Sequence, residues 1–202
     1  MPVRATLLGV GAMNSPRYAP AGLLLSCGRR HVVFDGGPGA EPPPRPRRLD
    51  GWLVTDEAAE LRTAVRRMAE ERGVVARMGG LDAGELRVRA LPVLHTSHPT
   101  CGYRIEAGGA VVVWAPEFWE FPEWAGGADL MFAEASAWNR RIRFRGGVGG
   151  HAHVREIGPE AARCGVRRLV YAHIGRPCLR AMDQGLRPAY GEWGVEGRVY
   201  RV

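Results

Sequence analysis

The most informative stretch of this sequence reads His31-Val32-Val33-Phe34-Asp35-Gly36-Gly37-Pro38-Gly39. Its apolar half, built from branched and aromatic side chains, predicts a buried strand. The strand ends at Asp35, and the glycines that follow predict a tight turn with positive φ angles. A second apolar run, 21–27, precedes it, and the three residues between the two runs predict a hairpin. Paired strands that end in an acidic, glycine-rich turn are therefore expected near the N-terminus.

Away from this hairpin, strands dominate the first half of the chain, and the second half alternates strands with helices. Further strands are predicted at 3–8, 52–54, 86–94, 102–106, 110–115, 130–132, 168–172 and 198–202. The segment 41–48 contains four prolines, so it is expected to be an exposed, extended connection. This order of elements predicts a layered α/β fold in a single domain, 1–202.

Two helices are expected. The first would run from Thr55 or Asp56 to about Arg72, with an apolar stripe at Leu61, Val65 and Met68. The second would occupy 159–164, with a proline in its first turn.

Composition limits the classes of protein to consider. The chain has 202 residues and a net charge of +7, and all 28 of its basic residues are arginine. The arginine excess has two readings, a G+C-rich genome or sites that bind phosphate or carboxylate through a planar fork. The basic balance favours an anionic partner.

The sequence also bears on the compartment. No apolar run approaches the length of about 18 residues that a membrane span needs, and the N-terminus shows no export pattern. The four cysteines, Cys27, Cys101, Cys164 and Cys178, form no C-x-x-C pair. We therefore expect reduced thiols in a cytoplasmic protein that does not associate with a membrane.

Several motifs together resemble one known family, the proteins of the metallo-β-lactamase fold, and within it the branch of tRNase Z and the cyclic phosphodiesterase of phosphonate breakdown. The resemblance covers nearly the whole chain and implies an αββα four-layer sandwich. The matching pieces, in order, are 8–11, 15–17, 33–39, His95 with 102–105, 113–117, 128–135, 150–151 and 169–174.

The resemblance is weakest at the family's zinc signature, T-H-x-H-x-D-H. The corresponding segment, 55–61, reads Thr-Asp-Glu-Ala-Ala-Glu-Leu, so Asp56, Ala58 and Leu61 replace the three histidines. Glu60 stands at the acidic position and is the corresponding candidate catalytic residue. Since this signature supplies most of a two-zinc site in the family, the usual dinuclear centre is not expected.

The residues that remain could still hold one ion. By the resemblance, the candidate ligands are Asp56, His95, Glu117 and His173, a set of two imidazoles and two carboxylates. Such a set suits one divalent metal ion, zinc first, with Mn²⁺ or Fe²⁺ at lower affinity. Acidic residues at a helix start also stabilise the helix dipole, so Asp56 does not require a metal.

A second constellation is a carboxylate and a histidine. In tRNase Z the equivalent pair protonates the leaving group, which makes Glu134 and His151 the candidate catalytic residues here. The alternative is a structural hydrogen bond beneath the sheet edge.

Between these two residues lies an arginine-rich segment. Arg140, Arg141, Arg143 and Arg145 surround Phe144 and are candidate substrate-binding residues for phosphate or nucleic acid. Arg176, just after His173, could add another anion contact. A solvated sheet edge would have the same composition.

Five aromatic residues, Trp114, Phe118, Trp119, Phe121 and Trp124, gather around Glu117. They could wall a pocket, cover a homodimer interface or simply fill the core.

The sequence thus leaves three functions open, and with them the question of whether the protein is an enzyme. The first is a metal-dependent hydrolase of phosphodiesters with an altered, mononuclear centre. The second is an inactive relative that binds an anionic small molecule, nucleotide or nucleic acid in the former cleft. The third is a subunit that docks a protein partner.

Overall fold

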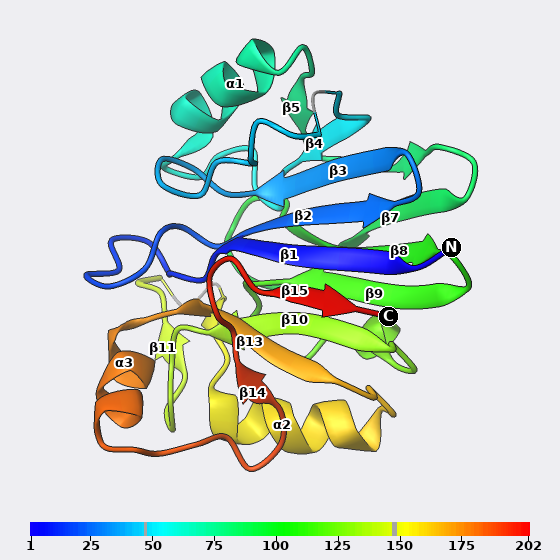
Figure 1. The fold of residues 1–202 in the computed structure, drawn as a ribbon. Helices are drawn as coiled ribbons and strands as arrows, with labels where there is room; N and C mark the ends of the chain where they lie inside the picture. The colour runs from blue at the N-terminus through cyan, green and yellow to red at the C-terminus, as the bar shows by residue number, and fades with distance from the viewer. Residues whose placement is uncertain (47, 147–148) are drawn as a thin grey trace.

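The computed structural model describes residues 1–46, 48–146 and 149–202. Two sheets pack face to face, with α1 (Arg62–Glu71) outside the first, and α2 (Val154–Arg163) and α3 (Arg176–Asp183) beyond the second (Figure 1). This arrangement confirms the predicted α/β sandwich in one domain.

The first sheet has the strand order β15-β1-β2-β3-β4-β5. The hairpin predicted from the opening stretch joins β2 to β3, with Leu24 opposite Val33. Both ends of the chain meet in this sheet, because β1 pairs with β15 (Figure 1). Its strands are β1 (Val3–Gly9), β2 (Gly22–Cys27), β3 (Arg30–Asp35), β4 (Gly51–Leu53), β5 (Ala76–Arg77) and β15 (Val199–Arg201).

The second sheet has the order β14-β13-β10-β9-β8-β7-β6. Its central strands β9, β10 and β13 are parallel, so their carboxyl ends meet at the same edge. Its strands are β6 (Leu81–Asp82), β7 (Leu86–Pro92), β8 (Cys101–Ala107), β9 (Ala110–Ala115), β10 (Leu130–Ala135), β13 (Leu169–Ile174) and β14 (Glu192–Trp193). A separate short hairpin, β11 (Ile142–Arg143) with β12 (Gly150–His151), and a 3-10 turn, η1 (Glu123–Ala125), lie outside it.

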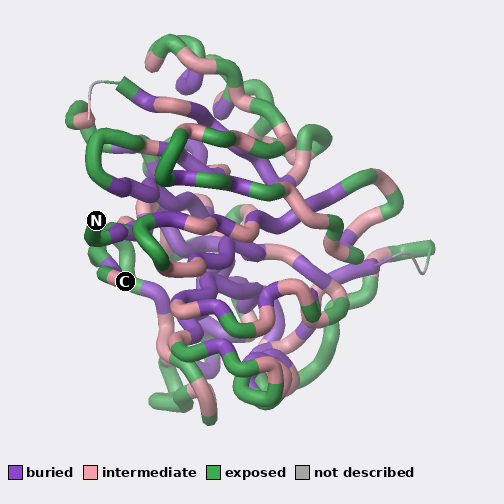
Figure 2. The backbone as a smooth tube through the Cα atoms, turned by 90° about the vertical axis from the view of Figure 1, so that its right-hand side faces the viewer, coloured by how far each residue is buried: buried purple, intermediate pink, exposed green. Residues whose placement is uncertain are grey.

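The hydrophobic core lies between the two sheets (Figure 2). Aromatic rings from opposite sheets meet there: Phe34 packs on Tyr103 at 5.1 Å between ring centroids, and Phe132 on Tyr200 at 5.3 Å. Fully burying one such side chain contributes about 1.5–3 kcal/mol. The core therefore holds the two sheets in a definite relative position.

A smaller apolar cluster attaches α1 to the outer face of the first sheet. Val65, Met68 and Ala69 of the helix are buried against Val33 and Trp52. The apolar stripe predicted for this helix is thus confirmed at Val65 and Met68.

The predicted start of this helix was wrong, since α1 begins at Arg62 rather than at Thr55 or Asp56. The intervening residues are held by side chains in a non-helical path. The Asp56 carboxylate accepts the Ala58 N–H at 2.7 Å, and the Glu57 carboxylate accepts the Met78 N–H at 2.8 Å. Such local bonds compete with helix formation.

The second helix was also misplaced, because α2 begins at Val154, five residues before Pro159. Glu156 accepts the backbone N–H of His153 at 3.2 Å, which caps the helix at an earlier point. In the segment 41–48, the described residues 41–46 and 48 lie in neither a helix nor a strand, and Arg47 lies outside the described residues. Within the described ranges, no helix has the length and apolar character to span a membrane.

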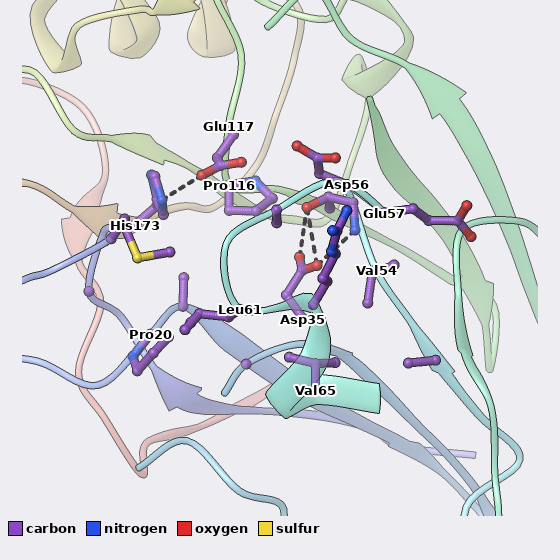
Figure 3. Close-up of a pocket in the computed structure, with 18 of the residues that line it drawn as sticks. Pro20, Asp35, Val54, Asp56, Glu57, Leu61, Val65, Pro116, Glu117 and His173 are labelled. Carbon is purple, nitrogen blue, oxygen red and sulfur yellow. Dashed lines mark hydrogen bonds and ion pairs between the residues drawn. The ribbon is translucent and has the colours of Figure 1, made fainter. Parts of the chain in front are cut away.

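Asp35, at the end of β3, ties the two sheets together. Its carboxylate accepts the Thr55 N–H at 2.7 Å and the Trp114 indole N–H at 2.7 Å. Figure 3 labels Asp35 at the pocket. Its backbone has φ of 47°, a region that Asp and Asn tolerate better than other residues with a Cβ. Burial raises the pKa of this carboxyl to about 6, although the bonds from Trp114 and Thr55 oppose the shift.

We predict that Asp35→Asn destabilises the protein by about 1–3 kcal/mol at pH 4, because its amide cannot accept the Trp114 N–H in the same way. Because the pKa of Asp35 is raised in the native state, wild type loses stability as pH rises from about 4 to 6. The Asn side chain of the variant does not titrate, so this loss is absent from the variant. Denaturant unfolding at several pH values should therefore show that the difference in free energy of unfolding between wild type and the Asp35→Asn variant becomes smaller as pH rises. Asp82→Asn, on β6, controls for the loss of a carboxylate. If the stability difference between wild type and Asp35→Asn did not change with pH, the raised pKa of Asp35 would be contradicted.

Candidate functional site

The site lies at the edge where β9, β10 and β13 end. Glu117 follows β9, Glu134 is near the end of β10, and His173 is near the end of β13. Functional side chains are often carried at the carboxyl ends of parallel strands, where loops begin. Two other segments reach this edge: the loop after β7, with His95 and His98, and β12, with His151.

A bulge between β10 and β13 turns His173 into the site. Ala133 pairs with Tyr171 and Ala135 with Ile174, so one residue of β10 lies opposite two residues of β13. His173 takes the extra position with φ of 58°. A bulge re-aims a side chain in this way, and a positive φ outside glycine is strained. This local backbone places the His173 ring beside Glu134.

The Glu117 carboxylate lies between two imidazoles. Its Oε1 is 2.6 Å from His173 Nε2, and its Oε2 is 3.4 Å from His95 Nε2 (the His173 pair is dashed in Figure 3). His95 donates its Nδ1–H to the Gly150 carbonyl at 2.8 Å, since a carbonyl can only accept. In neutral His95 the Nε2 lone pair therefore faces a carboxylate oxygen, an arrangement that a cation between them would stabilise.

Glu134 is fully buried and fully hydrogen-bonded. It accepts the Ser136 N–H at 2.7 Å, the Phe118 N–H at 3.3 Å and the His151 Nδ1–H at 2.7 Å. Burial alone would raise the Glu134 pKa, but His151 and His173 hold it well below the usual range. The carboxylate orients the His151 ring, whose Nε2 makes no hydrogen bond to any described residue.

His173 links the two carboxylates. Its Nδ1 is 2.9 Å from Ser136 Oγ and 3.5 Å from Glu134 Oε1, while its Nε2 faces Glu117. Burial disfavours charge on this imidazole, but Glu117 and Glu134 raise its pKa to about 10. Burial alone would raise the pKa of Glu117, but the charges of His173 and His95 lower it to about 2. With no metal ion bound, the two groups thus form an ion pair at neutral pH, and a metal ion held by His173 would take the place of the Nε2 proton.

Two overlapping groups could serve as metal ligands. Glu134, His151 and His173 have ligand atoms that all lie within 4.8 Å of one another. However, Glu134 already accepts three N–H donors, and His151 Nδ1 is one of them, so this group is a hydrogen-bonded support. His95 and His173 instead direct Nε2 atoms at Glu117, and their Nδ1 atoms are held by Gly150 and Ser136. Partners on the far ring nitrogen are typical of metal-binding histidines.

The predicted ligand Asp56 lies on another wall of the same region. It pairs with His98, with Oδ2 2.9 Å from Nε2. Asp56, Glu117 and His173 all line one pocket of about 730 Å³, part of it open to solvent (Figure 3). Three of the four candidate ligands thus line one pocket, and His95 lies outside its lining but contacts Glu117.

This pocket is acidic on one side and apolar on the other. Asp35, Asp56, Glu57 and Glu117 supply its acidic side. Pro20, Leu61 and Val65 form an apolar side (Figure 3), with Arg62 and Arg66 of α1 also on the lining. Glu60 is exposed and is absent from the lining, so its catalytic role stays a prediction.

The arginine predictions divide into two groups. Arg141 precedes the hairpin strand β11 and Arg143 ends it, and both guanidinium groups lie over the Trp119 ring. Arg140, Arg145 and Arg176 are exposed, and their role in binding stays a prediction. Phe144 packs edge-on against His95 and His151, at 5.3 and 5.2 Å between ring centroids.

Most of the aromatic cluster belongs to the core. Trp114 and Phe118 are fully buried, and Phe121 and Trp124 pack against the core. Trp119 belongs to neither group and is half-buried.

Three residues of the site did not stand out in the sequence as site residues: Ser136, Phe144 and Asp35. Ser136 follows Glu134 by two positions, which is the only local signal for it. Asp35 was visible in the opening stretch as the end of a strand, yet nothing local showed that it would reach Trp114.

Comparison with solved structures shows close agreement of fold at low sequence identity. The metallo-β-lactamase-fold protein YhfI from Bacillus subtilis superposes with a TM-score of 0.76 at 16% identity, covering 100% of both chains. A diphosphatase of the PhnP family gives 0.67 at 14% identity, over 100% of this chain and 98% of that one. The short form of human tRNase Z gives 0.67 at 15% identity, over 98% of both chains.

Among curated proteins, no sequence matches this chain significantly. A family model, the beta-lactamase superfamily domain, matches residues 42–174. That match includes the loop after β4, Glu117, Glu134, His151 and His173. Since it spans well over half of the chain, the protein belongs to the beta-lactamase superfamily and has the metallo-β-lactamase fold.

Proposed function

We propose that this protein is a hydrolase of phosphodiesters that works with one divalent metal ion held by His95, Glu117 and His173. The observation that carries the proposal is the convergence of two imidazole Nε2 atoms on the Glu117 carboxylate, at 2.6 and 3.4 Å. Supporting it, the similar structures include a diphosphatase and a tRNase Z.

The donor set fits one ion better than two. Two imidazoles and a carboxylate from three separate segments leave coordination positions open, as in catalytic zinc sites. The segment 55–61 contains no histidine, so the groups for a second complete ligand set are missing from it. A bound divalent ion would supply Lewis acidity and lower the pKa of a water.

The chain's own residues would handle the leaving group. Glu134 holds His151 by Nδ1, which leaves Nε2–H of the imidazolium free to donate a proton to the departing oxygen. Phe144 covers one side of His151 and limits its contact with water. Glu134 therefore acts as a positioning residue and His151 as the general acid.

A second candidate function is binding without catalysis, of an anionic small molecule or nucleotide. Two observations favour it: Asp56 is tied to His98, and Leu61 gives an apolar lining where the family signature supplies a histidine. Arg62 and Arg66 would provide the anion contacts in that case.

Metal loading tests the ligand set. Protein stripped of metal and reloaded with Zn²⁺ is expected to retain about one ion per chain, and His95→Ala should weaken retention at least about tenfold. His31→Ala removes a histidine bonded to Ser26 in the first sheet and should leave metal content unchanged. Equal zinc content in the His95→Ala variant and wild type would rule out this centre.

Activity separates the two candidate functions. Metal-loaded wild type is expected to hydrolyse a bis-aryl phosphodiester, and Glu117→Gln should reduce the rate about 10²-fold or more. Metal-loaded protein that stays inert on aryl and cyclic phosphodiesters, yet still binds nucleotides, would favour the binding function.

The role of His151 predicts a dependence on the leaving group. His151→Asn should lower kcat about 10²–10⁴-fold for a diester with an alkyl leaving group, which needs protonation. With a nitrophenyl leaving group, which departs as an anion, the loss should be much smaller. Equal losses for both substrates would show that His151 acts only in maintaining the structure.

A further inference from the structure

Leu61 has a position in the pocket that the proposed metal centre does not explain. It stands where the family signature has its last histidine, and it lines the same pocket as Glu117 and His173 (Figure 3). A Cβ added at Gly37 would lie 2.9 Å from Leu61 Cδ1 and 3.3 Å from Pro20 Cγ. Both apolar side chains thus lie against the same glycine turn and form a continuous apolar wall.

The first turn of α1 extends this wall and adds two cations to it. Val65 follows Leu61 by four positions and donates its N–H to the Leu61 carbonyl at 3.0 Å. Arg66 follows Arg62 by the same spacing, and residues four apart lie on the same face of a helix. All four side chains line the pocket, so an apolar row runs beside a basic row.

The carboxylates of the pocket already have partners within the chain. Asp35, Asp56 and Glu57 each accept a backbone N–H at 2.8 Å or less. Glu117 pairs with His173 at 2.6 Å. Apart from the metal ion proposed at Glu117, the acidic side therefore requires no cationic ligand.

The two arginines of the pocket have no such partners. Arg67, on the same helix, pairs with Glu71 at 3.6 Å, whereas Arg62 and Arg66 form no ion pair with any residue that the structure describes. Both are exposed on the pocket lining. A ligand that compensates them is anionic, and the guanidinium fork suits a carboxylate or a phosphate.

We propose that Leu61, Val65, Arg62 and Arg66 form a subsite for an amphiphilic anion, a molecule with an apolar chain or ring that ends in a carboxylate or a phosphate. The apolar part would lie on the two aliphatic side chains, and the anionic end would reach the arginine pair. The inference rests on the proposed function only where it makes this molecule part of the substrate, a diester with an apolar substituent. Binding itself requires neither metal nor turnover.

Calorimetric titration in the presence of EDTA tests the subsite without metal. The probes are the straight-chain carboxylates from butanoate to octanoate, together with octyl phosphate, 1-octanol and octylammonium. Each added methylene should strengthen carboxylate binding about threefold to fourfold. Octanoate and octyl phosphate should both bind more tightly than 1-octanol, and octylammonium should bind most weakly. The tighter of the two anions identifies the preferred head group.

Leu61→Asn tests the apolar row. Leu61 is the residue that precedes the first turn of α1, a position at which Asn is favoured, so the variant is expected to fold. It should weaken octanoate binding about tenfold and remove the dependence on chain length. Val75→Asn, at an exposed apolar residue outside the pocket lining, should change neither.

Arg66→Gln tests the basic row. It should weaken octanoate binding about fivefold and leave 1-octanol binding unchanged, because only the anion uses the guanidinium. Arg67→Gln removes the same charge from the same helix outside the pocket lining and should leave both ligands unaffected. Equal effects of the two substitutions, tighter binding of octylammonium than of octanoate, or no binding of any probe would overturn the subsite.

Turnover separates this inference from the proposed function. Nitrophenyl phosphodiesters whose alkyl group ranges from methyl to hexyl should show a KM that falls with chain length in metal-loaded wild type but not in Leu61→Asn. Octanoate binding that depends on Leu61 in a protein without hydrolase activity would sustain the subsite and refute the reaction. Hydrolysis with the same KM for every chain length would sustain the reaction and refute the subsite.

Discussion

The buried carboxylate of Glu134 is the group around which the site is assembled. An ionised side chain removed from water costs several kcal/mol unless donors and opposite charge surround it. Here the N–H groups of Phe118 and Ser136 and the ring of His151 surround it. Each donor comes from a different segment, so satisfying one charge draws together the loop after β9, the end of β10 and the strand β12.

The same requirement extends to the next pair of groups. His173 lies between Glu134 and Glu117, and its cationic form compensates both carboxylates. The bulge that brings it there costs backbone strain, which the two ion pairs offset. Backbone strain and buried charge thus occur together at one edge of the sheet, as is typical of functional sites.

The pocket beside this cluster combines two kinds of surface. Its acidic side would attract a cation, whereas Pro20, Leu61 and Val65 offer apolar contact. In the segment 55–61 the side chains of Asp56 and Glu57 bond to backbone N–H groups, so that the loop folds without any histidine. This loop thus keeps its shape without histidines, and the ligands of the proposed metal centre, His95, Glu117 and His173, lie in other segments.

The sequence by itself determined the longer strands of both sheets, because runs such as 31–34 and 130–132 are apolar enough to be buried in any compact arrangement. The two-residue strands β5, β6 and β14 were not predicted. It also determined that histidines and carboxylates would follow strand ends. The starts of the helices were not predicted correctly from the sequence. Side-chain hydrogen bonds of Asp56 and Glu57 keep the residues before α1 out of the helix, and the cap supplied by Glu156 sets the start of α2.

Only the tertiary structure decided which of these groups meet. Asp56 was expected beside His95, but it pairs with His98, and Trp119 looked like its aromatic neighbours until Arg141 and Arg143 were found over its ring. The physical reason is that pairing depends on distances between segments far apart in the chain. Periodicity shows which face of an element is buried, whereas the partner across the gap is set by how the sheets and loops pack.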